Sequence, residues 1–344
     1  MKKFYCALGL CACAPLAAHA QSAVTVYGIL DASVANDSGR YAAGPVNTMV
    51  TGGQAGSRIG FKGVEDLGGG LAAIFNLESG FNINDGALTQ GSGVLFGRKA
   101  LVGLQGAFGS IKAGRQDSAM YTTTVYFDPF FEGITGAYTR IMTNISTLRR
   151  NDNTIDYSTP TLYGFKSELA YSFGEVAGDN AAGRGYSGSI NYVRGPFSAG
   201  LAYQSQNSKP VAPEPIVTTR LAALGSAYDF EVIKLYALFS TNRADSTLRV
   251  DARDLLLGAT VPFGASAVQT SLIRHQERAQ TDAGARQAAL GYTYALSKRT
   301  SLYARYAWIW NDANGRLGLA TLATGGAASG STDKLFSTGI SHTF

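Results

Sequence analysis

The sequence predicts an all-β chain, a 16-stranded antiparallel transmembrane β-barrel. Three observations lead to this prediction: short turns recur at nearly regular intervals, side chains between them alternate with a period of two, and an export signal precedes the first strand. From the third turn onward, turn centres lie about 34 residues apart, which fits two strands and one loop. The seven turns are Glu65–Gly70, Gly106–Gly109, Pro160–Gly164, Arg194–Pro196, Asp229–Val232, Pro262–Gly264 and Ser297–Thr300.

The segments between the turns have the residue chemistry of strands. A period near 34 also suits helical repeat proteins, but the 42 glycines and the widespread Val, Thr, Tyr and Phe disfavour long helices. In Phe165–Gly174 the odd positions are mostly apolar, while the even positions are polar or small. Val24–Val34 and Leu71–Phe81 alternate in the same way. One face of each strand is therefore expected to meet an apolar medium.

The N-terminus indicates export. Two lysines precede the apolar run Phe4–Leu16, and Ala18-His19-Ala20 ends it with the small-x-small pattern of a cleavage site. We therefore expect residues 1–20 to be a cleaved signal peptide and residues 21–344 to be a single barrel domain. An alternative is lipid attachment at Cys13, because Leu10-Cys11-Ala12-Cys13 faintly resembles a lipobox.

Cleavage of the signal peptide would remove every thiol group from the chain. All three cysteines precede residue 21, so disulfides, thiolate catalysis and cysteine metal sites are excluded from the mature chain. No cofactor or metal is expected. The formal net charge of +5 falls by two when Lys2 and Lys3 are lost, which leaves too little positive charge to argue for a nucleic-acid partner.

The medium around the barrel is expected to be an outer membrane. No mature segment reads as a spanning helix, and the longest uncharged stretch, Leu255–Ile273, is interrupted by a Pro-Phe-Gly turn. An exported chain of amphipathic strands fits a closed barrel, in which every backbone group is paired around the ring. A soluble β-sandwich is the alternative. Aromatic residues flank most of the short turns, as a girdle at a membrane interface requires: Phe108, Tyr163, Phe165, Phe197, Tyr228, Phe230 and Phe263.

Seven hairpin turns plus a first and a last strand imply sixteen strands and eight longer loops. Sixteen strands enclose a lumen too wide for side chains to fill, which favours transport. One loop is longer than a hairpin needs by about 20 residues, and such surplus chain is usually functional. The expected loops are Asn36–Ala55, Asn82–Gly93, Asp117–Thr147, Glu175–Arg184, Asn207–Thr219, Arg243–Asp251, Glu277–Ala285 and Asn311–Asp333.

Several segments together resemble the general diffusion porins of beta-proteobacteria, over essentially the whole mature length. The resemblance implies an outer-membrane homotrimer for passive diffusion of ions and small hydrophilic solutes, surrounded by lipid and lipopolysaccharide. The terminal Phe344 is similar to the signal read by the outer-membrane assembly machinery. The segments that carry the resemblance are Ser22–Asp31, Gly56–Gly63, Phe75–Phe81, Gly97-Arg98, Phe108–Gln116 and Asn153–Pro160.

The resemblance implies that the third long loop, Asp117–Thr147, folds inward and narrows the channel. Its acids are Asp117, Asp128 and Glu132, and five aromatic residues supply bulk for packing against the inner wall. Asp128-Pro129-Phe130 sits where the family has an acidic, Pro-containing tip. Which of the carboxylates faces the opposite wall stays open, and a loop held outside the barrel is the alternative.

Opposite this loop the family places basic side chains that point inward, and strand parity selects the candidates here. Arg58 and Lys62 flank outward-facing Ile59 and Phe61, Arg98 lies an odd step before Leu101, which is taken as outward-facing, and Arg150 shares the parity of Asp156. A basic wall facing an acidic loop creates a transverse field that admits polar solutes. The expected selectivity is a weak preference for anions.

Two other functions remain as alternatives, an outer-membrane hydrolase and an adhesin or purely structural barrel. After processing only His275 and His342 remain as histidines, and no Gly-x-Ser-x-Gly motif or zinc spacing occurs. His275 is expected at the rim of a loop and His342 on the outward face of the last strand. We therefore expect no enzymatic activity.

Overall fold

The computed structural model describes residues 23–39, 44–91, 93–142, 145, 147–210, 215–245, 250–319 and 327–344. The predicted signal peptide lies outside these residues. Within them the chain forms a 17-stranded sheet. Its strands are β1 (Ala23–Ser38), β2 (Val46–Thr51), β3 (Arg58–Gly68), β4 (Leu71–Gly80), β5 (Lys99–Gly106), β6 (Gly109–Asp117), β7 (Arg150–Ser158), β8 (Phe165–Ser172), β9 (Gly185–Arg194), β10 (Phe197–Asn207), β11 (Thr218–Asp229), β12 (Lys234–Ala244), β13 (Val250–Phe263), β14 (Ser266–Glu277), β15 (Ala285–Ala295), β16 (Thr300–Asn311) and β17 (Thr332–Thr343).

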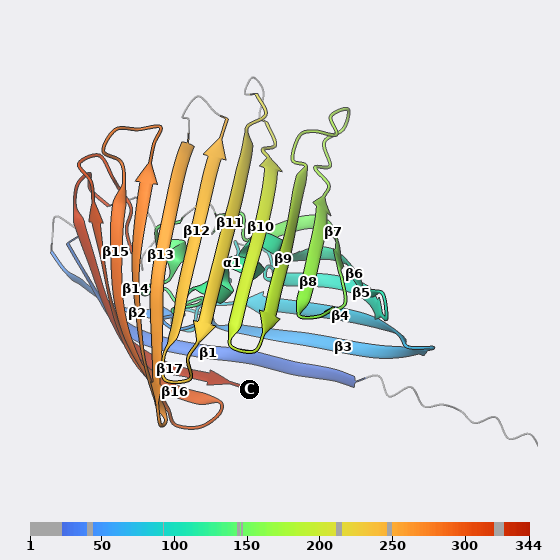
Figure 1. Cartoon of the computed structure of the whole chain (residues 1–344), viewed down its shortest axis with the longest axis horizontal. Coiled ribbons are helices and arrows are strands. Elements are labelled where there is room, and N and C mark those ends of the chain that lie inside the picture. The colour runs from blue at the N-terminus through green and yellow to red at the C-terminus, as the bar shows by residue number, and fades with distance from the viewer. Residues whose placement is uncertain are drawn as a thin grey trace, which may run out of the picture.

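The sheet closes on itself. From β3 onward each strand pairs antiparallel with the next, and β1 pairs with β17 (Figure 1). Both β2 and β3 pair with β1, β2 along Ala32–Asp37 and β3 along Ala23–Ile29. They therefore act as the two halves of one barrel strand. The barrel has 16 strands in this sense, and the predicted fold class is confirmed.

The interruption between β2 and β3 corrects one predicted loop. Asn36–Ala55 was expected to be a single long loop, but β1 runs to Ser38 and β2 begins at Val46. The glycine-rich segment 52–57 breaks the second barrel strand instead. Its backbone groups have other partners: the Asp31 carboxylate accepts from the backbone N–H groups of Gln54 and Ala55. Glycines in such a break look the same in sequence as glycines in a turn.

The seven predicted short turns all connect consecutive strands, and they lie at the end of the barrel opposite the longer loops (Figure 1). Because short turns of bacterial outer-membrane barrels face the periplasm, the longer loops mark the outer face. In the part of the chain that the structure describes, no helix is both long and apolar enough to cross a membrane.

Alternation places apolar side chains on the outside of the barrel. Leu169, Leu201 and Leu224 are more than half exposed, whereas their inward neighbours Ala202 and Ala223 are buried. The outward set includes the seven aromatic residues beside the short turns, which are 40–92% exposed. The outer surface therefore carries the apolar band and the aromatic girdle expected of a barrel in lipid.

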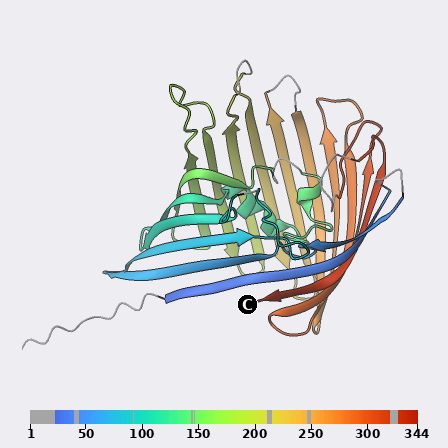
Figure 2. The same ribbon diagram turned by 180° about the vertical axis from the view of Figure 1, so that it is seen from behind.

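The chain between β6 and β7 folds into the barrel. It contains the helix α1 (Ala119–Thr124) and the 3-10 helices η1 (Val125–Phe127) and η2 (Tyr138–Arg140). Figures 1 and 2 show α1 within the ring of strands, and α1 contacts β9, β10 and β11. The expected inward loop is confirmed, and the described residues between 118 and 149 are called the inner loop below.

Candidate functional site

The inner loop packs closely on one side of the barrel because glycines line the wall there. A Cβ added at Gly225 would lie 2.1 Å from Phe127 Cδ2, and one at Gly258 would lie 2.8 Å from Pro129 Cδ. Phe127 and Phe130 are almost completely buried. Since the wall offers no side chain at these points, the aromatic rings of the loop contact its backbone directly.

The far end of the inner loop is tied to the strand break and to β16. The backbone N–H of Ile134 donates to the Gly52 carbonyl at 2.9 Å. Arg305, on β16, donates from Nη1 to the carbonyls of Gly53 (3.1 Å) and Phe130 (3.4 Å). The inner loop is therefore held against the barrel wall at the break in the second barrel strand.

Asp128 holds the tip of the inner loop in shape. Its side chain is buried, and its oxygens accept from the backbone N–H groups of Phe130 (2.9 Å) and Tyr138 (2.7 Å). Burial raises the pKa of Asp128 to about 7, although these two donors oppose the shift. Among the described residues, Asp128 forms no ion pair.

Glu132 is the loop carboxylate that meets the opposite wall. Its oxygens lie 2.6 Å from Arg58 Nη1 and 2.5 Å from Arg149 Nη2, and Arg98 Nη2 is 3.6 Å away. The Tyr121 hydroxyl donates to Oε1 at 3.0 Å. Burial alone raises the pKa of Glu132, but the three guanidinium groups outweigh it and hold the pKa well below its ordinary value.

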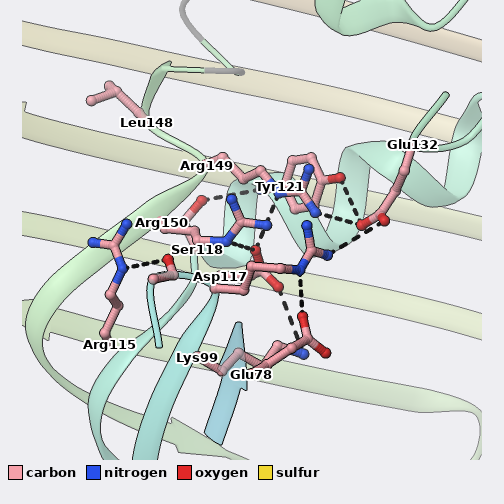
Figure 3. Close-up of polar contacts among 12 residues, drawn as sticks. Glu78, Lys99, Arg115, Asp117, Ser118, Tyr121, Glu132, Leu148, Arg149 and Arg150 are labelled. Atoms are coloured by element: carbon pink, nitrogen blue, oxygen red, sulfur yellow. Dashed lines mark hydrogen bonds and ion pairs between the residues drawn. The ribbon is translucent and has the colours of Figure 1, made fainter. Parts of the chain in front are cut away.

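A second carboxylate, Asp117, lies where the inner loop leaves β6. Its oxygens are 3.3 Å from Arg149 Nε, 3.2 Å from Arg150 Nε and 3.7 Å from Lys99 Nζ (Figure 3). Arg149 therefore bridges Asp117 and Glu132, and its guanidinium carbon lies 3.8 Å from the centre of the Tyr121 ring. Arg150 Nη2 has no hydrogen-bond partner among the described residues.

Glu78, on β4, completes the arrangement. Arg98 Nε lies 2.5 Å from its Oε1, and the Tyr27 hydroxyl donates to Oε2 at 2.8 Å. Eight charged residues are thereby linked by ion pairs, five basic and three acidic. We call them the charged cluster: Arg58, Arg98, Lys99, Arg149, Arg150, Glu78, Asp117 and Glu132.

The structure brings most of the predicted site residues together. Arg58, Arg98 and Arg150 join Asp117 and Glu132 in the charged cluster. The other two lie apart, each with different neighbours. Lys62 Nζ is 5.3 Å from the centre of the Tyr27 ring. The hydrogen bonds of Asp128 described above come from backbone N–H groups of its own loop.

Three members of the charged cluster escaped sequence reasoning. Glu78 was given no role, and Lys99 was missed because it shares a strand face with Leu101, which was taken as outward-facing. Arg149 carries no strand parity, since it precedes β7. The parity argument for Arg98 was wrong: Leu101 pairs with Asn76, and both line the lumen beside Lys99.

A hollow of about 480 Å³ adjoins the charged cluster on the lumen wall. Three ammonium groups border it, those of Lys62, Lys99 and Lys112, together with the carboxylates of Asp117 and Glu168. Lys112 is paired, because its Nζ lies 2.7 Å from Asp156 Oδ1. The basic surface therefore continues from the inner loop toward the short-turn end of the lumen.

A closed barrel with an apolar outer band, narrowed by an inward loop that meets a basic wall, defines a class of protein: the diffusion channel of an outer membrane. A family model described as Gram-negative porin matches residues 7–314, and the chain belongs to this family. It is located in the outer membrane and functions as a general porin.

Individual relatives agree with this assignment. The chain is 33% identical to outer membrane porin protein 32 of Delftia acidovorans, with 100% of both chains covered. It is 31% identical to an outer membrane porin protein of Bordetella pertussis, covering 88% of this chain and 93% of that one. A solved structure, an anion-selective porin from Comamonas acidovorans, matches with a TM-score of 0.86 at 31% identity, covering 94% of this chain and 100% of that chain.

Proposed function

We propose that this porin prefers anions and that the charged cluster is its filter. The observation that carries the proposal is the imbalance of the cluster, in which five cationic side chains face three carboxylates. The imbalance leaves an excess of positive charge at the edge of the inner loop, where the local dielectric constant is lower than in bulk water. The anion-selective porin named above supports the same sign.

The acids of the cluster contribute little negative field of their own. Glu132 and Asp117 each lie beside more than one cation, so a passing cation meets carboxylates that are already paired. Arg150 Nη2 also lacks a hydrogen-bond partner among the described residues, but the atom is buried, so Arg150 acts on passing ions through its charge and not through contact. We assign brief contacts with permeating anions to Lys62 and Lys99, which border the hollow.

We also propose that the mature chain comprises residues 21–344 and assembles as a homotrimer in contact with outer-membrane lipid and lipopolysaccharide. The ring of Phe344 packs against Gly28, and the two residues exchange backbone hydrogen bonds at 3.1 Å. A C-terminus that closes the barrel in this way supports its use as a signal by the assembly machinery.

Single-channel recording in a planar bilayer tests the channel and the trimer together. Purified, folded protein should insert with conductance in groups of three equal steps. A single step per insertion would contradict the trimer. Folded protein without any conductance would contradict the channel and would favour the adhesin or structural alternative.

We further propose that the chain is not an enzyme. The arrangement that comes nearest to a hydrolytic triad is His275 Nδ1, 2.7 Å from Asp254 Oδ1, with the Ser240 hydroxyl donating to Asp254 Oδ2 at 3.0 Å. Both Ser240 and Asp254 are buried, and the serine bonds to the aspartate rather than to the histidine, so it is not activated as a nucleophile. Lipid or peptide hydrolysis that His275→Ala abolishes would overturn this proposal.

A further inference from the structure

An apolar groove with a basic upper end lies on the outer surface of the barrel, across β13–β16. Its volume is about 710 Å³, and the leucines that border it include Leu255, Leu257 and Leu272, which are 46–62% exposed. Arg274, Arg286 and Trp310 border the same groove. It faces the medium around the barrel and is separate from the lumen and the charged cluster.

The two arginines stand directly opposite each other. In the ladder between β14 and β15, Arg274 pairs with Arg286, and both belong to the outward-facing row that contains Leu272 and Leu290. Like charges in such cross-strand positions repel and destabilise the sheet. Asp312 relieves only one of them: its Oδ2 lies 3.0 Å from Arg274 Nη2, whereas no carboxylate of the described residues forms an ion pair with Arg286. The pair is therefore short of one negative charge.

Tryptophan lies beside the arginines. Trp310 is the cross-strand partner of Arg286, and its ring stacks on that of Trp308 with centroids 6.3 Å apart and planes 5° from parallel. Tryptophan concentrates at the interface between lipid and water. β14 ends at Glu277 and β15 begins at Ala285, so the arginines lie near the long-loop end of the barrel, level with the outer leaflet.

We propose that this groove binds an anionic glycolipid of the outer leaflet, with a headgroup phosphate between Arg274 and Arg286 and an acyl chain along the leucines below. The guanidinium group suits phosphate because it donates two parallel hydrogen bonds, and the missing negative charge at Arg286 is what the phosphate supplies. The leucine wall offers the acyl chain an apolar surface at the depth where the chain begins. This inference rests on the outer-membrane location and not on the proposed anion preference.

Trp310 borders the groove, and Trp308, the other tryptophan of the chain, stacks on it, so intrinsic fluorescence reports on this site. The folded protein in detergent micelles is titrated with bisphosphorylated lipid A, and separately with lipid A from which both phosphates have been removed. We expect a saturable change in tryptophan emission with the phosphorylated lipid and about tenfold weaker binding, or worse, without the phosphates. Equal binding of both lipids would overturn the proposal.

Substitutions at Arg286 and at a distant arginine distinguish binding at this groove from a general effect of charge on lipid binding. Arg286→Glu should weaken lipid A binding by about tenfold or more, and the milder Arg286→Gln should weaken it less. Arg194→Glu is the matched control, because Arg194 is an exposed arginine at the opposite, short-turn end of the barrel. Two results would contradict the proposal: unchanged affinity in Arg286→Glu, or the same fluorescence change with inorganic phosphate alone. Channel conductance is recorded in parallel and should be unaffected.

Discussion

The inner loop meets the barrel wall in two different ways on its two sides. Toward β10–β15 it packs Phe127, Pro129 and Phe130 against glycines, with hardly any space between them. Toward β3–β7 it presents Glu132 to a group of guanidinium groups. The apolar side fixes where the loop lies, and the charged side faces the solute. The difference shows how one loop can be rigidly positioned and still border a water-filled passage.

Removing Glu132 should cause the largest loss of stability on the charged side of the inner loop. Glu132→Ala leaves Arg58, Arg98 and Arg149 without their shared carboxylate, and breaking such a buried ion pair typically costs about 3–5 kcal/mol. Denaturant unfolding of the detergent-solubilised protein measures this loss. Asp152→Asn is the control, because Asp152 is 64% exposed in its pair with Arg115 and should change stability little. Equal losses in both variants would contradict the assigned role of Glu132.

A larger side chain at one wall glycine should disrupt the packing on the apolar side of the inner loop. Gly225→Val places a side chain in the space of the Phe127 ring, and overpacking of this kind costs about 1–3 kcal/mol. Because Phe127 anchors the inner loop, the loop should also shift and single-channel conductance should rise. Combining Gly225→Val with Phe127→Ala should recover part of the lost stability. A double variant whose losses simply add would show that the two positions do not interact.

The pH dependence of stability sharpens the comparison, since the two acids respond in opposite senses. The raised pKa of Asp128, about 7 against an ordinary 3.8, means that the folded chain binds a proton there more tightly than the unfolded chain. Its contribution to stability is complete below pH 3.8 and is lost as pH rises to about 7. The lowered pKa of Glu132 makes its contribution complete above its ordinary pKa of 4.5 and lost only in stronger acid.

Unfolding measured between pH 4 and 7 should therefore reveal the Asp128 component, and Asp128→Asn should remove it. Asp152→Asn again serves as the control and should keep the slope of the wild-type protein. An unchanged slope in Asp128→Asn would show that the buried carboxyl does not change its protonation on unfolding.

The smallest expected effect separates two basic residues of the predicted wall. Arg150→Gln removes a cation of the charged cluster, and it should lower the chloride-to-potassium permeability ratio by about twofold. Lys62→Gln removes the same charge outside the cluster, so its effect should be smaller. The measurement is the reversal potential across a KCl gradient. A larger shift in reversal potential for Lys62→Gln would contradict the charged cluster as the filter and would assign selectivity to the hollow.

Strand parity selected Arg58 correctly, because period-two alternation is a local property of the chain. Glu132 was named only as one of three loop acids, through the family resemblance, and the sequence left open which of them faces the wall. The break after Thr51 and the role of Gly225 could not be predicted in the same way. Both depend on where the inner loop contacts the barrel wall. The contact between Phe127 and Gly225, for example, joins residues about a hundred positions apart in the chain. Arg149 was missed because it lies just before a strand, where alternation gives no direction.

The central claim is that the excess of basic side chains around the inner loop sets the selectivity. The most direct test is the reversal potential of the wild-type protein in a planar bilayer across a KCl gradient at neutral pH. The claim predicts the sign of a chloride-selective pore. A potassium-selective sign would contradict it, because the paired carboxylates of Asp117 and Glu132 would then dominate the five neighbouring cations.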